Sequence, residues 1–204
     1  MLDFIHRFIP PEKGSPWTLL LLHGTGGDEN DLLSLGAELA PGAALLSPRG
    51  KSLENGMNRF FRRLSMGVLD VEDLKFRTGE LVNFVESAAK EYGRDPSKVI
   101  AVGYSNGANV AASMLLLRPG VLAGAVLLRP MVPSVPEELP ALQDRPIWIG
   151  GGKRDTVIPP SQTAELSRLL QLTGAKVEEH WSPGGHELSA GELQAAKQWL
   201  ASVI

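Results

Sequence analysis

The chain has 204 residues, 43% of them hydrophobic, which is enough for one globular domain with a sizeable core, and we expect residues 1–204 to form it. The formal net charge of −3 lacks the basic excess that binds nucleic acids or acidic membranes, so we expect neither as a partner. The absence of cysteine excludes disulfides, thiolate metal sites and a cysteine nucleophile.

The predicted elements alternate between short apolar runs and longer amphipathic stretches. The apolar runs lack polar alternation, which is typical of strands buried on both faces of a parallel sheet. In chain order we predict a strand over 17–23, a helix over 28–40, a strand over 43–47, an irregular basic and aromatic segment over 51–67, a helix over 71–92, a strand over 98–103, a helix over 106–117, strands over 121–128 and 146–150, a helix over 160–172, a strand over 176–181 and a helix over 189–203.

The pattern of side chains adds a prediction for the first and for the last of these helices. We expect the first helix to turn four leucines toward the core: Leu32, Leu33, Leu35 and Leu39. The last helix opens with Ser189-x-x-Glu192, which predicts a capping box.

Alternating strands and helices predict an α/β fold with a mostly parallel central sheet and helices on both faces. The chain has no insertion long enough for a lid domain. Ligands of such sheets bind at the carboxyl ends of the strands, so we expect the functional residues in the loops at those ends.

The opening residues MLDFIHRFIPPEKG lack a basic leader and a long apolar stretch, and the longest aliphatic run, Leu19 to Leu22, is too short to span a bilayer. We therefore expect a cytoplasmic protein with no membrane partner.

The sequence Gly103-Tyr104-Ser105-Asn106-Gly107 matches the pattern G-x-S-x-G. The pattern is weak alone, but here it joins a predicted strand to a predicted helix. Glycines on both sides leave room for a tight strand-to-helix turn that exposes Ser105 at the sheet edge, as a nucleophile requires. The alternative is a connecting turn whose serine caps the following helix.

Four segments in this order resemble the small carboxylesterase/phospholipase branch of the α/β hydrolases, which includes acyl-protein thioesterases and lid-less bacterial carboxylesterases: Leu22 to Asp28, Gly103 to Gly107, Gly152 to Pro159 and Gly184 to Glu187. Residues 58–63 look closest to the bacterial carboxylesterases. Thioesterase-like members often carry Gln after the nucleophile, where this chain has Asn106, which disfavours a protein-deacylating role.

A serine nucleophile needs a neutral base and an acid that orients it. His186 lies among glycines after the last predicted strand, and Asp155 follows the strand at 146–150, which gives the chain order Ser, Asp, His that this fold uses. The competing acids are Asp144, at the wrong end of its strand, and Glu187. For His23 we expect a structural role, in fixing the loop that follows it.

The resemblance also implies an oxyanion hole made by the backbone N–H groups of Thr25 and Asn106. For the substrate pocket we predict Arg59, Phe60, Phe61 and Val157, with the aromatic rings holding an acyl or aryl group and an arginine meeting an anionic tail. The alternative is a solvated basic face with two core phenylalanines. No ligand spacing for a metal and no cofactor motif is present.

These residues predict a serine hydrolase that cleaves small soluble carboxylic esters, with the ester as its small-molecule partner and no cofactor. A thioesterase, peptidase or acyl transferase would use the same residues, and a non-catalytic binding module is the third hypothesis. A homodimer stays open as a further partner hypothesis.

Overall fold

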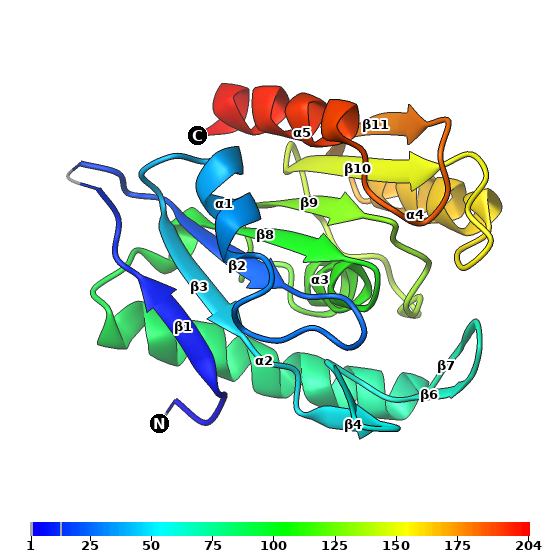
Figure 1. Cartoon of the computed structure of the whole chain (residues 1–204), viewed down its shortest axis with the longest axis horizontal. Coiled ribbons are helices and arrows are strands. Elements are labelled where there is room, and N and C mark those ends of the chain that lie inside the picture. Colours follow the sequence, from blue (N-terminus) through cyan, green and yellow to red (C-terminus); the bar gives the residue numbers. More distant parts are fainter. Residues whose placement is uncertain (1, 13) are drawn as a thin grey trace.

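The computed structural model describes residues 2–12 and 14–204, and its centre is a seven-stranded sheet (Figure 1). The strand order is β1-β3-β2-β8-β9-β10-β11; β1 runs antiparallel to β3, and the other neighbours are parallel. The strands are β1 (His6–Ile9), β2 (Thr18–Leu22), β3 (Ala44–Pro48), β8 (Val99–Tyr104), β9 (Gly124–Leu128), β10 (Pro146–Gly152) and β11 (Lys176–Ser182).

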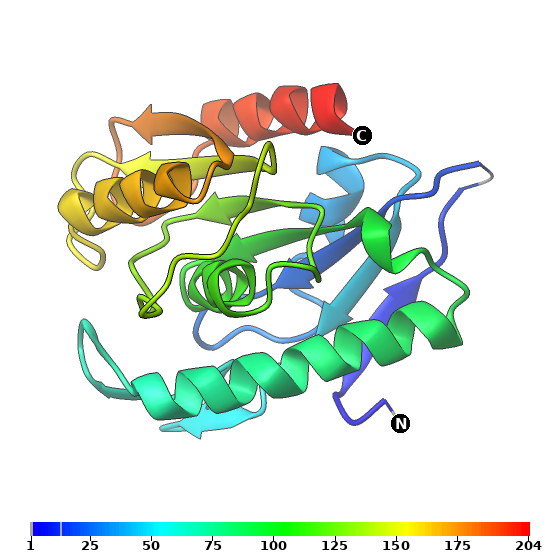
Figure 2. The same ribbon diagram turned by 180° about the vertical axis from the view of Figure 1, so that it is seen from behind.

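Helices cover both faces of the sheet, as the sequence predicts. The helices are α1 (Leu33–Leu39), α2 (Val71–Glu91), α3 (Asn106–Leu117), α4 (Pro160–Leu172) and α5 (Ala190–Val203), with a short 3-10 helix η1 (Pro96–Lys98). Helices α1 and α5 lie over one face, and Figure 2 shows α2, α3 and α4 over the other. None of the helices in the described part of the chain combines the length and apolarity that a bilayer crossing needs.

The apolar strands place side chains on both faces because successive residues of a strand point to opposite sides. In β2, Leu20 and Leu22 pack into the core under α2, α3 and α4, whereas Leu19 and Leu21 pack into the core under α1 and α5. Each of these four side chains is fully buried. The continuous apolar run therefore corresponds to a strand that serves two cores.

The first helix is shorter than its predicted range of 28–40. Helix α1 begins at Leu33, and Gly36 and Leu39 are its buried residues, while Leu32, Leu33 and Leu35 are half-buried. Asp28 explains the late start, because its side chain accepts the backbone N–H of Asn30 at 2.7 Å and thereby stabilises a turn in place of a helix. The capping box that opens α5 at Ser189 is confirmed.

The segment over 51–67 is not irregular, which corrects the sequence prediction. It forms two hairpins, β4 (Ser52–Glu54) with β5 (Met57–Arg59) and β6 (Arg63–Ser65) with β7 (Val68–Leu69). The first turn is Asn55-Gly56, with φ of 52° and 79°, which is the residue pair that tight hairpin turns favour. Strand β1, at the edge of the sheet, was also not predicted.

The strand order positions the loops that matter for function. Strand β3 lies on one side of β2 and β8 on the other, so the strand order reverses between β2 and β8. Leu22 at the end of β2 is in register with Gly103 in β8. The loops after these two strands therefore leave the sheet together, at the place where open parallel sheets bind ligands.

Candidate active site

Ser105 occupies a sharp turn between β8 and α3. Its φ of 52° and ψ of −112° are unfavourable for a residue with a side chain, at a cost of about 1–3 kcal/mol. The turn depends on both flanking glycines, because a Cβ at Gly107 would overlap the Leu22 carbonyl and one at Gly103 would lie 2.6 Å from the Gly107 carbonyl oxygen. The backbone N–H of Ser105 donates to the Leu128 carbonyl at 2.8 Å, which holds the turn against β9.

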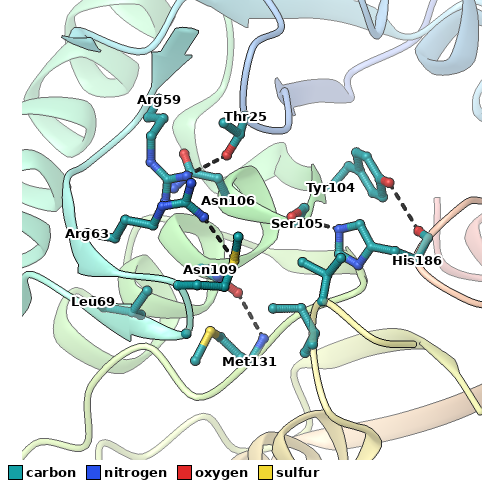
Figure 3. A pocket seen from close by; sticks show the side chains of 14 residues that line it. Thr25, Arg59, Arg63, Leu69, Tyr104, Ser105, Asn106, Asn109, Met131 and His186 are labelled. Carbon is teal, nitrogen blue, oxygen red and sulfur yellow. Dashed lines mark hydrogen bonds between the residues drawn. The ribbon is translucent and has the colours of Figure 1, made fainter. Parts of the chain in front are cut away.

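The three side chains predicted to act together are in contact, although they are far apart in sequence. The Ser105 hydroxyl lies 3.0 Å from Nε2 of His186, and Nδ1 of His186 lies 2.8 Å from Oδ2 of Asp155 (Figure 3 shows the first contact). An ionised carboxylate only accepts hydrogen bonds, so Asp155 places the imidazole proton on Nδ1. Nε2 is then free to accept the hydroxyl proton of Ser105.

The carboxylate of Asp155 is fixed from its other side as well. Its Oδ1 accepts the backbone N–H groups of Val157 and Ile158 at 2.8 and 2.9 Å, and only 2% of the side chain is exposed. These two hydrogen bonds define the direction of Oδ2. The loop after β10 thus holds the acid in one orientation.

The competing acids point elsewhere. Asp144 pairs with Lys176 at 2.9 Å, at the end of the sheet where β10 begins. Glu187 accepts the backbone N–H of Gly185 at 3.3 Å, within its own loop. Asp155 is therefore the carboxylate that meets His186.

His23 holds loops together, as expected. Its Nε2 accepts the backbone N–H of Gly50 at 3.0 Å, so the ring proton is on Nδ1, which donates to the Gly24 carbonyl at 2.7 Å. Burial is the main cause that lowers the pKa of His23 below its ordinary value, and the neutral ring suits both contacts. The loop after β2 is thereby joined to the chain that follows β3.

Two backbone N–H groups near Ser105 are available to a ligand. Those of Thr25 and Asn106 have no hydrogen-bond partner within residues 2–12 and 14–204, and both residues line the cavity that contains Ser105. Asn106 is the first residue of α3, where N–H groups have no partner within the helix. Asn58 fixes the loop of Thr25, because its carbonyl accepts the Gly26 N–H at 2.9 Å and its Nδ2 donates to the Gly27 carbonyl at 2.9 Å.

Arg129 is a site residue that the sequence reasoning missed. It follows β9, is fully buried, and has a φ of 56°. Its guanidinium donates to the carbonyls of Gly185 and Glu187 at 2.9 and 2.8 Å, on both sides of His186, and it is paired with Glu192 of α5. It also lies 4.0 Å from Asp155. An arginine directly after a fully apolar strand was the sequence signal that could have identified it.

Tyr104 supports the same loop from the strand side. Its hydroxyl donates to the backbone carbonyl of His186 at 3.0 Å, and its ring lies 5.4 Å from the imidazole (Figure 3). Burial raises the pKa of Tyr104, which keeps the hydroxyl protonated as a donor.

A cavity of about 240 Å³ opens beside Ser105, and its lining can be compared with the predicted substrate-binding residues. Arg59 and Val157 line it, but Phe60 and Phe61 do not, which corrects their prediction as substrate-binding residues. Both phenylalanine rings are buried in the core under α2, where full burial stabilises the fold more than a half-open pocket would. The apolar lining comes instead from Met66, Leu69, Met131 and Ile158.

In the described ranges, no cluster of three or more His, Asp or Glu side chains could hold a metal ion.

Comparisons with known proteins agree with this architecture. The phospholipase/carboxylesterase family matches residues 5–204. The chain is 50% identical over 194 residues to the Bacillus subtilis (strain 168) protein MhqD, which carries the name of a hydrolase; the match covers 95% of this chain and 97% of that protein.

Two solved structures are similar to this chain in three-dimensional structure as well as in sequence. The Bacillus cereus carboxylesterase has a TM-score of 0.96 and 46% identity, covering 99% of this chain and 95% of that one. A carboxylesterase from Mesorhizobium loti has a TM-score of 0.89 and 34% identity, covering 98% and 95%. With its α/β-hydrolase fold, this chain belongs to the phospholipase/carboxylesterase family of hydrolases.

Proposed function

We propose that this chain hydrolyses small carboxylic esters through an acyl-enzyme, with Ser105 as nucleophile, His186 as proton carrier and Asp155 as the acid that orients the imidazole. The observation that supports the proposal is the unbroken chain of hydrogen bonds, 3.0 Å from Ser105 to His186 and 2.8 Å from His186 to Asp155, beside an accessible cavity. This arrangement is what acyl transfer from an ester to a serine requires.

In the first half of the reaction, Nε2 of His186 takes the proton of the Ser105 hydroxyl while the oxygen attacks the ester carbonyl. The bond between the carbonyl carbon and the alcohol oxygen then breaks, and the imidazolium returns its proton to that oxygen. In the second half, His186 takes a proton from a water molecule whose oxygen attacks the acyl carbon. The bond between that carbon and the Ser105 oxygen then breaks, the imidazolium returns its proton to the Ser105 oxygen, and the acid leaves.

The negative charge that develops on the carbonyl oxygen is stabilised by the backbone N–H groups of Thr25 and Asn106. Each such donor contributes about 3 kcal/mol to the stability of the transition state. The donors are held in place before the substrate arrives, Thr25 by its braced loop and Asn106 by the start of α3.

The size of the cavity supports a small substrate. Its volume of about 240 Å³ lies below the range of roughly 300–1,000 Å³ that is common for drug-sized ligands. Methionine and leucine side chains supply the apolar surface, and these suit a short acyl group.

A fluorophosphonate probe and a panel of esters test the proposal together. We expect the probe to attach to Ser105, as read from the mass of the labelled peptide. The Ser105→Ala variant should show an unchanged circular dichroism spectrum, no labelling, and a kcat about 10⁶-fold lower. The matched control is Ser202→Ala, which removes an exposed serine hydroxyl on α5 and should leave labelling and kcat unchanged.

The outcomes separate the competing functions. Ester hydrolysis faster than that of matched thioesters and amides supports the proposal, whereas a strong preference for thioesters would assign the site to a thioesterase. Labelling at another residue, or activity in Ser105→Ala within tenfold of the unaltered protein, would overturn it. No reaction with the probe at all would indicate a binding module.

A further inference from the structure

One wall of the cavity is basic. Arg59 and Arg63 line it, and the titratable groups among the other lining residues are His186 and the Tyr104 hydroxyl. No carboxylate of the described residues lines the cavity. In Figure 3 the two arginines lie on one side of Ser105 and His186 lies on the other. A ligand at Ser105 would therefore have a general base at one end and guanidinium groups at the other.

Arg59 is held rigidly in this wall. It is 4% exposed, its Nε donates to the Phe61 carbonyl at 3.1 Å, and its Nη1 donates to Oγ1 of Thr25 at 2.6 Å. Its Nη2 has no hydrogen-bond partner in the described part of the chain. A guanidinium that is immobilised with a free edge is suited to bind a planar oxyanion, because little freedom is lost when the anion arrives.

The positive charge of the wall is not balanced by its neighbours. Both arginines share one carboxylate, Glu54, which lies 3.3 Å from Arg59 and 2.7 Å from Arg63. Burial, and then the repulsion of Arg63, lower the pKa of the Arg59 guanidinium, which means that the charged form lacks sufficient compensation.

The adjacent amide adds to this polarity. Oδ1 of Asn106 accepts the Phe60 N–H at 2.7 Å, and its Nδ2 is buried with no hydrogen-bond partner among the described residues. The start of α3 also adds a partial positive charge on this side. Two nitrogen donors on this side of the cavity, Nη2 of Arg59 and Nδ2 of Asn106, thus have no partner among the described residues, which favours a negatively charged ligand group.

The position of His186 decides which part of the substrate meets the arginines. In the mechanism proposed above, His186 delivers a proton to the alcohol oxygen as it leaves, so the alcohol part must lie on the His186 side. The acyl part then extends in the opposite direction, toward Arg59 and Arg63 (Figure 3).

We propose that Arg59 and Arg63 bind a carboxylate at the far end of the acyl group, so that the preferred substrates are monoesters of short dicarboxylic acids. This inference rests on the proposed esterase function and names its substrate class. The acyl carbon is transferred to Ser105 with release of the alcohol, and water then releases the dicarboxylate, with each proton carried by His186. The carboxylate on the arginines takes no part in bond exchange.

The first experiment compares substrates that differ in one charge. Monomethyl succinate and methyl succinamate carry a carboxylate and a carboxamide at the same acyl position, and methanol release measures both reactions. We expect kcat/KM to be at least about tenfold higher for the carboxylate at low salt, as charged hydrogen bonds would give. The preference should shrink as ionic strength rises.

A second pair carries the charge on the alcohol. Acetoxyacetate and acetoxyacetamide are esters of acetic acid in which the alcohol bears the carboxylate or the carboxamide. For this pair we expect no preference for the anion, because the alcohol lies near His186. A preference for acetoxyacetate that equals or exceeds the preference for monomethyl succinate would overturn the assignment to the acyl side.

Three arginine variants locate the effect. Arg59→Gln should bring the preference for monomethyl succinate down to within about threefold of unity, and Arg63→Gln should reduce it in part. The control is Arg62→Gln. The Arg62 side chain is 63% exposed, pairs with Asp70 and does not line the cavity. This variant should therefore keep the full preference.

The readout is the ratio of kcat/KM for the two esters. It therefore separates binding of the anion by Arg59 from the hydrogen bond by which Arg59 holds Thr25. If Arg59→Gln slows both esters by the same factor, Arg59 only holds the loop, and the proposal is wrong. If Arg59→Gln does not fold, the proposal is tested by the effect of Arg63→Gln and of ionic strength on the preference for monomethyl succinate. A preference that changes with neither the substitution nor the salt overturns the proposal. Hydrolysis of both esters without preference would reject the anion site alone, whereas hydrolysis of no ester would reject the esterase function.

Discussion

At the scale of single residues, Arg129 supports the hydrogen-bonded series Ser105–His186–Asp155 without belonging to it. Its guanidinium binds the carbonyls on both sides of His186, and it is also near Asp155. It can therefore keep the imidazole aligned with both partners. Its own charge is compensated by buried Glu192.

We predict that Arg129→Met lowers the free energy of unfolding by about 3–5 kcal/mol, because Glu192 becomes a buried charge without a partner. The double variant Arg129→Met/Glu192→Leu removes both charges and should recover much of this loss, as measured by urea denaturation. If Arg129 positions His186, kcat stays low in the stable double variant while KM changes little. A double variant with full kcat would show that Arg129 serves stability alone.

At the scale of elements, His23 connects the loop after β2, which carries Thr25, to the chain after β3. Because burial lowers the pKa of His23 below its ordinary 6.5, the folded protein binds fewer protons than the unfolded chain at mildly acidic pH. The free energy of unfolding must then fall as the pH drops below about 6.5, by up to about 1.4 kcal/mol per pH unit for this one group.

We predict that His23→Gln is less stable than the unaltered protein at pH 7.5 but loses this acid-side slope between about pH 6.5 and 5. Thermal unfolding followed by circular dichroism over this pH range measures the effect. His180→Gln is the matched control, since His180 is half-buried on β11 and stacks on Trp148, outside the loop that His23 holds. An unchanged slope in His23→Gln would assign the pH dependence to other groups.

The elements also show what the sequence could predict. The helices over 106–117 and 160–172 match their predicted bounds, because long amphipathic or apolar runs with clear stop signals define them. The hairpins in 51–67 were missed although Asn55-Gly56 is a strong turn signal, because each strand has three residues or fewer and shows no periodicity. Likewise, nothing local distinguishes β1, which is a strand only because β3 is beside it.

The site was predictable to the extent that its residues lie at strand ends. Ser105 and Asp155 each follow a strand that the apolar pattern reveals, whereas His186 follows β11, a largely polar strand. All three lie beyond the carboxyl ends of parallel strands, which brings them to one rim of the sheet. The direction of a side chain is a different matter. Phe60 and Phe61 follow Arg59 directly, yet the rings enter the core and the guanidinium meets the cavity, a choice made by tertiary packing.

At the scale of the whole molecule, the sheet is shared by two cores. Alternate residues of β2, β8 and β9 serve one core or the other, so neither core can be lost while the sheet persists. We therefore predict one cooperative unfolding transition. Leu81→Ala on α2 and Leu200→Ala on α5 should each lower the free energy of unfolding by about 2–5 kcal/mol.

The test compares two probes of the same denaturant titration. Tryptophan fluorescence reports mainly on the core under α1 and α5, because Trp148 belongs to it and Trp17 and Trp199 pack against it, which accounts for three of the four tryptophans. Circular dichroism reports on the backbone as a whole. We expect the two midpoints to coincide in both variants and to move together. A fluorescence midpoint that moves in Leu200→Ala but not in Leu81→Ala would show that the two cores unfold separately.

Because the strands are mostly parallel, the sheet has two different rims, one at the carboxyl ends of the strands and one at their amino ends. The loops of Ser105, Asp155 and His186 leave the carboxyl ends of their strands, whereas Gln143 is exposed just before β10 begins, on the opposite rim. Because the chain has no cysteine, Gln143→Cys would carry its sole thiol. A maleimide-coated bead would then tether every copy from behind and leave the cavity mouth facing the bulk liquid, a convenient format for repeated turnover in a packed column.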